Sequence, residues 1–151
     1  MSYRIDIHRE MYTIISHLES GDLAPEDVVR FLNEIVEIGE SFIEGKLPCL
    51  YHILLTSETR FEFGTILRAL SSLRQNEAMI NVRRQLNMMT ILVGSGMQNL
   101  QFTQHMMSTP QYGGRPIAIL PTLDLAIESV RRDIVAQGLD YTSPFATGGH
   151  S

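Results

Sequence analysis

The residue types that most often carry chemistry are sparse in this sequence. No histidine lies at metal-ligand spacing from another histidine, and none lies in a cluster of cysteines or carboxylates. The five histidines are His8, His17, His52, His105 and His150. No Gly-x-Ser-x-Gly elbow, His-Glu-x-x-His helix or paired acidic motif occurs. The sequence therefore predicts no metal site, no cofactor and no catalytic site, whereas an enzyme would need Ser57, His52 or Glu62 to converge in a cleft with a perturbed pKa.

Ser57 and Thr59 are hydroxyl groups that follow an apolar segment ending at Leu55. Thr59 and Glu62 have the spacing of a capping box, in which a hydroxyl and a carboxylate each accept a hydrogen bond from a free backbone N–H at the start of a helix. The simplest role for both hydroxyls is helix capping.

The segment Gly94-Ser95-Gly96 lies between an expected strand and an expected helix. Backbone N–H groups in such a turn can approach a phosphate or another anion. The segment lacks the third glycine of a dinucleotide fingerprint and the Gly-Lys-Ser/Thr of a P-loop. It is either an anion-binding loop or a plain strand-to-helix turn with Ser95 as the cap, and the plain turn is the favoured interpretation.

Methionines gather in the middle of the chain. Five of the eight lie within one stretch of the sequence, at Met88, Met89, Met97, Met106 and Met107. Methionine adapts to irregular partners, so Met97, Met106 and Met107 are candidates for an apolar ligand pocket or a protein interface. Ordinary core filling is the favoured alternative.

Length and composition indicate one globular domain. The chain has 151 residues, of which 44% are hydrophobic and 19% charged. We expect a domain at 1–138 and a flexible C-terminal tail at 139–151, which is rich in Thr, Ser, Gly and Pro. The net charge of -5 is spread along the chain and predicts no nucleic-acid or anionic-membrane partner. The lone Cys49, and a start without an apolar leader or a membrane-spanning stretch, predict the cytoplasm.

The hydrophobic pattern predicts strands that alternate with helices. We expect strands at 3–8, 11–18, 49–55, 88–93 and 117–120. We expect helices at 25–45 and 59–73, a short helix that ends near 85, one at 97–107 and a last one that Thr122 caps and Gly138 ends. The first two strands are separated only by Arg9-Glu10, which predicts a hairpin. The predicted fold class is α/β, with a mixed, mostly parallel five-stranded sheet and four to five helices.

This order of elements, together with two helix starts, resembles the STAS-like group, which is related to anti-sigma-factor antagonists and to Sec14-type lipid-binding domains. The two starts are Leu23-Ala24-Pro25-Glu26-Asp27 and, after Arg115-Pro116-Ile117-Ala118-Ile119, Leu123-Asp124-Leu125-Ala126-Ile127. Members often carry Leu-Thr-Pro-Glu-Asp at the first start and Leu-Asp-Glu-Ala at the second. Ala24 here replaces the threonine and Leu125 the glutamate, and the likeness covers about residues 3–135.

The resemblance implies a non-enzymatic interaction or regulatory module, with another protein or a second copy of the chain as its partner. It also implies a phosphorylatable hydroxyl after the third strand, where Ser57 and Thr59 stand without the usual preceding aspartate and following glycine. Glu58 and Glu62 oppose added negative charge there. The kinship with Sec14-type domains leaves a second function open, which is a small carrier or sensor of a lipid or another apolar molecule, with a cavity under the methionine segment.

Overall fold

The computed structural model describes residues 3–18, 25–46, 51–55, 71–86, 88–94, 101, 104–106 and 117–139. The strands are β1 (Tyr3–His8), β2 (Thr13–Leu18), β3 (Tyr51–Leu55), β4 (Met89–Val93) and β5 (Ile117–Leu120). The helices are α1 (Pro25–Glu44), α3 (Glu77–Gln85) and α5 (Leu123–Ala136). Residues 71–75, 101 and 104–106 are also helical. The fold is α/β, as the sequence predicted.

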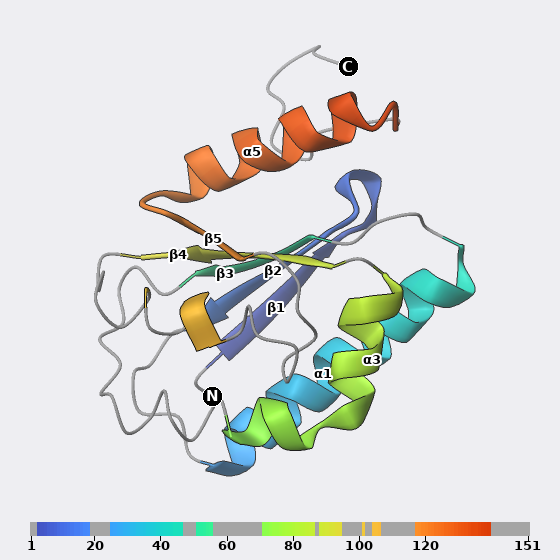
Figure 1. Cartoon of the computed structure of the whole chain (residues 1–151), viewed down its shortest axis with the longest axis vertical. Helices are drawn as coiled ribbons and strands as arrows, with labels where there is room; N and C mark the ends of the chain where they lie inside the picture. The colour runs from blue at the N-terminus through green and yellow to red at the C-terminus, as the bar shows by residue number, and fades with distance from the viewer. Residues whose placement is uncertain are drawn as a thin grey trace.

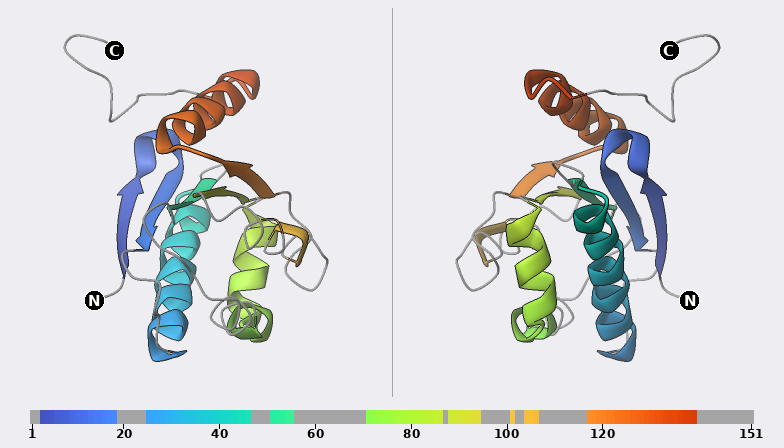
Figure 2. Two further views of the ribbon diagram at one scale, coloured as in Figure 1. Left: turned by 90° about the vertical axis from the view of Figure 1, so that its left-hand side faces the viewer. Right: turned by 90° about the vertical axis from the view of Figure 1, so that its right-hand side faces the viewer.

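The five strands form one sheet in the order β1-β2-β3-β4-β5, and every strand therefore lies beside its neighbour in sequence. β1 and β2 are antiparallel, whereas the pairs β2–β3, β3–β4 and β4–β5 are parallel. Helices α1 and α3 lie on one face of the sheet and α5 lies on the other (Figure 1 and Figure 2). The predicted N-terminal hairpin and mixed, mostly parallel sheet are both confirmed.

The turn of the hairpin is longer than the sequence predicted. Residues Arg9–Met11 form a single 3-10 turn, Tyr12 follows with φ of 53°, and β2 begins at Thr13 instead of at Met11. The turn is fixed by burial, because Met11 is fully buried and its carbonyl accepts a hydrogen bond of 2.7 Å from the Thr13 hydroxyl. The apolar Met11 therefore fills the core from a turn, although its pattern in the sequence was typical of a strand.

Helix α1, which the sequence predicted at 25–45, covers its face of the sheet with an apolar stripe. Its buried side chains include Val28, Leu32, Ile35, Val36 and Phe42. Glu26 and Asp27 lie in the first turn, where acidic side chains interact favourably with the helix dipole. Gly39 faces α3, and a Cβ at this position would overlap with Cγ1 of Val82. The missing side chain of Gly39 is therefore what allows α1 and α3 to pack closely.

Helix α5 is attached to the opposite face by an N-cap, an apolar stripe and a polar anchor. The Thr122 hydroxyl accepts a hydrogen bond of 3.2 Å from the backbone N–H of Leu125, which confirms the predicted cap. The buried stripe consists of Ala126, Val130 and Ile134. At the other end the Tyr51 hydroxyl donates to Asp133, and the Gln137 amide donates to both.

The chain leaves α5 where the sequence predicted. Gly138 has φ of 73°, a left-handed conformation that glycine adopts without a steric penalty. Leu139 then packs partly buried against the cluster between α5 and the sheet. The rest of the predicted C-terminal tail lies outside the described residues.

The contact of Gly39 with Val82 gives a test of the packing between α1 and α3. We predict that Gly39→Ala lowers the free energy of unfolding by about 1–2 kcal/mol, because overpacking of about 1–3 kcal/mol outweighs the gain of up to about 1 kcal/mol from replacing a helical glycine. Urea denaturation measures the change. The matched control is Gly39→Ala in a Val82→Ala background, where the added methyl group has room and should stabilise the protein. Destabilisation of equal size in both backgrounds would contradict the proposed contact.

Candidate functional site

Only part of the predicted site lies within the described residues. Gly94 and Met106 are described. The remaining candidates lie outside the described ranges and are Ser57, Thr59, Ser95, Gly96, Met97 and Met107. The two strands that precede most of these residues, β3 and β4, are described. Their last residues show where the chain leaves the sheet toward the candidates.

The ends of β3 and β4 lie side by side. Leu55, the last residue of β3, pairs in parallel register with Val93, the last residue of β4. The chain therefore leaves the sheet at adjacent points, toward Ser57 after one strand and toward Gly94 after the other. Two segments that are far apart in the sequence thus begin at one edge of the sheet.

Gly94 is buried at this edge, and its backbone is already used. Its N–H donates a hydrogen bond of 3.3 Å to the carbonyl oxygen of Leu120, which extends the pairing of β4 with β5. This donor therefore holds the sheet together, and an anion at the predicted loop would have to rely on Ser95 and Gly96.

Met106 belongs to the core at its position. It is partly buried and packs against the apolar cluster between α1, α3 and the sheet. Two residues earlier, the Gln104 side chain donates a hydrogen bond of 2.6 Å to the carbonyl oxygen of Ile117 in β5. These contacts favour the core-filling interpretation for Met106.

A third and smaller apolar cluster lies on β3, β4 and β5. Leu92 and Ile117 are its buried members, and Leu54 and Ile119 pack against them partly buried. Leu54 also packs against the larger cluster between α1, α3 and the sheet. The apolar interior is therefore continuous from α1 to the strand ends near the candidate segments.

A buried polar group is the main feature of the structure that the sequence analysis missed. Ser16 in β2 and His52 in β3 lie on the face covered by α1 and α3, and the Ser16 Oγ is 2.8 Å from the His52 Nε2. Thr90 in β4 is the register partner of His52. All three residues are buried, and Ser16 is 0% exposed.

The electrostatic environment keeps His52 neutral. Burial, followed by the positive charge of Arg83 in α3, lowers the pKa of His52 from 6.5 to about 3. Arg83 is itself fully buried, and the Phe31 ring of α1 lies 6.0 Å from the imidazole. At neutral pH the imidazole therefore has one N–H donor and one acceptor nitrogen, one of which is used by Ser16.

The Ser16–His52 pair has the residue types of a catalytic nucleophile and general base, but it lacks their accessibility to a substrate. In catalytic pairs the base takes the proton of a serine that a substrate can reach. Here proton transfer would create an imidazolium in a buried layer that already contains the Arg83 guanidinium, and Ser16 is 0% exposed. The pair is suited to satisfying two buried polar groups with one hydrogen bond.

The sequence could indicate that His52 is buried, but it could not indicate the contact of His52 with Ser16. A strand that is covered on both faces buries most of its side chains, so the place of His52 within an apolar segment indicates burial. Its contact with Ser16 spans 36 positions of the chain and depends on the register of β2 against β3. Periodicity within one segment does not give that register.

Within the described ranges, no group of three or more His, Cys, Asp or Glu side chains is arranged to hold a metal ion. The same residues include no helix that is long and apolar enough to cross a membrane. Comparison with protein-family models, with curated proteins and with solved structures finds no match to this chain.

The lowered pKa of His52 predicts how stability depends on pH. Between pH 6.5 and about pH 3, the unfolded chain binds a proton at His52 that the folded protein does not bind. The free energy of unfolding therefore falls as the pH decreases through this window, by up to about 1.4 kcal/mol per pH unit from this residue, and its contribution is constant above the window. Urea denaturation at a series of pH values measures the slope.

The control is His52→Gln, whose amide can bond to Ser16 but does not titrate. We expect a shallower slope for His52→Gln than for the wild-type protein. Identical slopes in the two proteins would show that the folded and unfolded chains bind a proton at His52 equally well.

Proposed function

We propose that this chain is a non-enzymatic STAS-like interaction or regulatory module. Its partner is another protein or a second copy of the chain, and it binds at the sheet edge where β3 and β4 end. The proposal is supported by the hairpin, the long helix from Pro25 and the final strand and helix, which are elements that carry the resemblance to the STAS-like group. The lone Cys49 supports a cytoplasmic location.

The observation that carries the proposal is the pairing of Leu55 with Val93. Because of this pairing, two segments begin at neighbouring points of one edge of the sheet. One carries Ser57 and Thr59, and the other carries Ser95, Gly96 and the candidate methionines. Leu55 itself is partly exposed at this edge. Segments that leave a rigid sheet side by side can present one composite surface to a partner, as binding loops on α/β scaffolds do.

The buried polar pair supports an interaction role over catalysis. The Ser16–His52 contact has the composition of a catalytic pair, and it is sealed from solvent with its histidine held neutral. We therefore assign it to the interior, where it connects β2 to β3.

A phosphate on Ser57 or Thr59 is the regulatory step of the proposal. It would add about 1.5–2 negative charges beside Glu58 and Glu62, and the resulting repulsion would change the surface that a partner meets.

A second candidate function, a carrier or sensor of an apolar molecule, is supported by one feature. The buried Leu92 and Ile117, with the partly buried Leu54 and Ile119, form an apolar cluster on β3–β5, and Leu54 links this cluster to the one under α1. Apolar ligands bind in pockets lined by such side chains.

The proposed surface can be tested by site-specific photo-cross-linking in the cell from which the protein comes. A cross-linking residue at Leu55 should capture one discrete protein, whereas the same residue at Glu40, on the exposed side of α1, should not. Ser57→Glu, which adds negative charge, should reduce the yield at Leu55 at least about threefold, and Ser57→Ala should leave it unchanged. Equal patterns at Leu55 and Glu40 would contradict the proposal, and an unchanged yield with Ser57→Glu would contradict its regulatory step.

A further inference from the structure

The outer face of α5 carries a line of exposed and half-exposed side chains, which we call the α5 stripe. It consists of Leu125, Glu128, Arg132 and Val135. Leu125 is 49% and Val135 58% exposed, and they are two of the four large apolar side chains that are exposed among the described residues. The spacing of three, four and three positions places the four residues in one line along the helix, opposite the buried Ala126, Val130 and Ile134.

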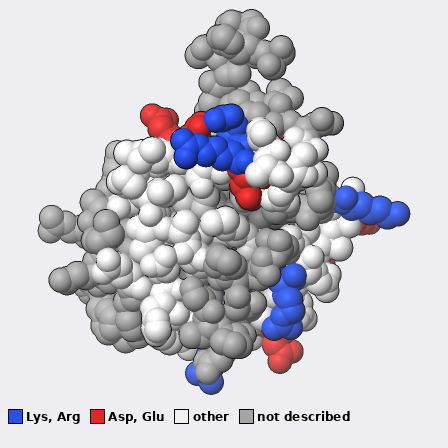
Figure 3. Space-filling model, turned by 45° about the horizontal axis from the view of Figure 1, so that its top comes forward, with Lys and Arg blue, Asp and Glu red and all other residues white. Residues whose placement is uncertain are grey.

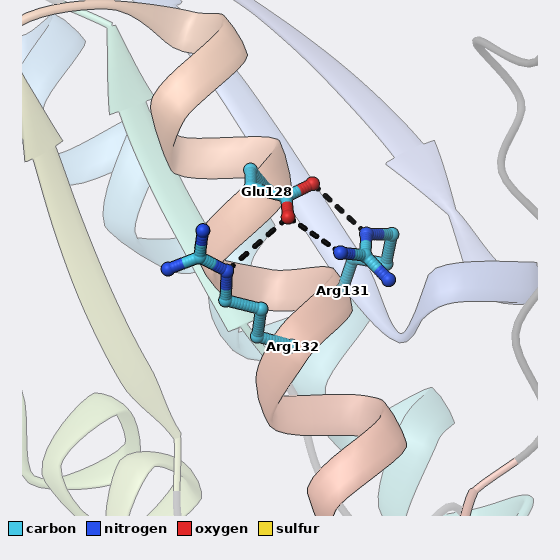
Figure 4. Close-up of polar contacts among 3 residues, drawn as sticks. All are labelled: Glu128, Arg131 and Arg132. Carbon is cyan, nitrogen blue, oxygen red and sulfur yellow. Dashed lines mark hydrogen bonds and ion pairs between the residues drawn. The ribbon is translucent and has the colours of Figure 1, made fainter.

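The middle of the α5 stripe is charged. Hydrogen bonds from Arg131 and then from Arg132 lower the pKa of Glu128 to about 2, so that its carboxylate is ionised at neutral pH. Arg131 binds the carboxylate through two nitrogens, whereas Arg132 contacts it through Nε alone, at 3.2 Å (Figure 4). Figure 4 draws one contact from Arg132 to Glu128, made by Nε, and the Arg132 side chain is 76% exposed. Acidic and basic side chains lie together in the upper part of Figure 3.

The α5 stripe is complementary to itself when it is reversed. Leu125 and Val135 are each five positions from residue 130, and Glu128 and Arg132 are each two positions from it. Two copies of α5 that pack antiparallel about this point would place Leu125 against Val135 of the second copy. The same packing would place Glu128 against Arg132 of the second copy, twice by symmetry. A parallel pair would instead bring Glu128 against Glu128.

We propose that α5 is a self-association surface and that its partner is a second copy of this chain, bound antiparallel through the α5 stripe. A twofold axis makes such an interface isologous, with each contact occurring twice. The 3-4-3 spacing is that of the positions which face the partner helix in a coiled coil, so all four side chains of the α5 stripe would lie at the contact. The inference goes beyond the proposed function, because it assigns a second copy of the chain to a surface other than the edge where β3 and β4 end.

The size of the surface sets the expected strength of the association. A helix of 14 residues is about 21 Å long, and one such helix from each copy buries less than the roughly 1,200 Å² at which stable interfaces begin. The dimer should therefore be weak and should form as the protein concentration rises.

Charge reversal tests the arrangement by sedimentation velocity over a range of concentrations. Glu128→Arg places arginine against Arg132 of the second copy, and Arg132→Glu places glutamate against Glu128. Each variant alone should raise the dissociation constant for self-association about tenfold or more, because like charges then meet twice. A mixture of the two variants should form a heterodimer at least as tightly as the wild-type protein associates, since opposite charges meet at both contacts. The double variant Glu128→Arg/Arg132→Glu should regain self-association.

The matched control is Glu37→Arg, the same charge change at an exposed position of α1, which should associate like the wild-type protein. Circular dichroism checks that each variant is folded, and the mixture and the double variant keep the test valid if one single variant is destabilised. A wild-type protein that stays monomeric at every concentration, a dimer indifferent to both reversals, or a mixture that does not associate would each overturn the inference. These outcomes leave cross-linking at Leu55 unaffected, whereas failure of that cross-linking contradicts the proposed function and leaves the association of α5 standing.

Discussion

Successive side chains of β3 point to opposite faces of the sheet and are buried on both. This alternation is the constraint on which the rest of the structure depends. Tyr51 and Ile53 belong to the cluster under α5, whereas His52 lies with Ser16 on the face covered by α1 and α3. All three β3 residues are buried. A shift of β3 by one position would exchange the two sets of side chains. Such a shift would break the anchor from Tyr51 to Asp133 and the contact of His52 with Ser16 together.

The same constraint separates the polar interior from the surfaces that can bind. Because His52 must be buried, its imidazole is neutral and its one assigned hydrogen bond goes to Ser16. The two surfaces that we propose for binding lie elsewhere, at the edge where β3 and β4 end and on the outer face of α5. The sheet holds both surfaces in fixed positions, since α5 is tied to β3 by Tyr51 and the two strand exits are tied to each other by Leu55 and Val93.

The elements of the fold could be predicted from the sequence because each leaves a local pattern. The stripe from Val28 to Phe42 repeats with helical period, and Thr122 has the residue type and place of an N-cap. Contacts between distant segments leave no such pattern. The pairing of Ser16 with His52 depends on the register of two strands, and the approach of Gly39 to Val82 depends on how two helices cross. The turn at Met11 was missed because burial in the tertiary structure outweighed a strand-like local pattern.

The candidate site was predictable only in part, for the same physical reason. Hydroxyls, glycines and methionines could be noted one by one, but the adjacency of the segments that carry them follows from the pairing of Leu55 with Val93. The complementarity of the α5 stripe is a property of the exposed face, which becomes visible only when the buried face is known.

Native mass spectrometry of gently purified protein is the most direct test of the central claim, because it reports the number of subunits and any retained small molecule together. An interaction module predicts an assembly built of protein alone, either two or more copies of the chain or the chain with a partner protein. A discrete extra mass of small-molecule size that denaturation releases would contradict this account and would favour a carrier of an apolar ligand.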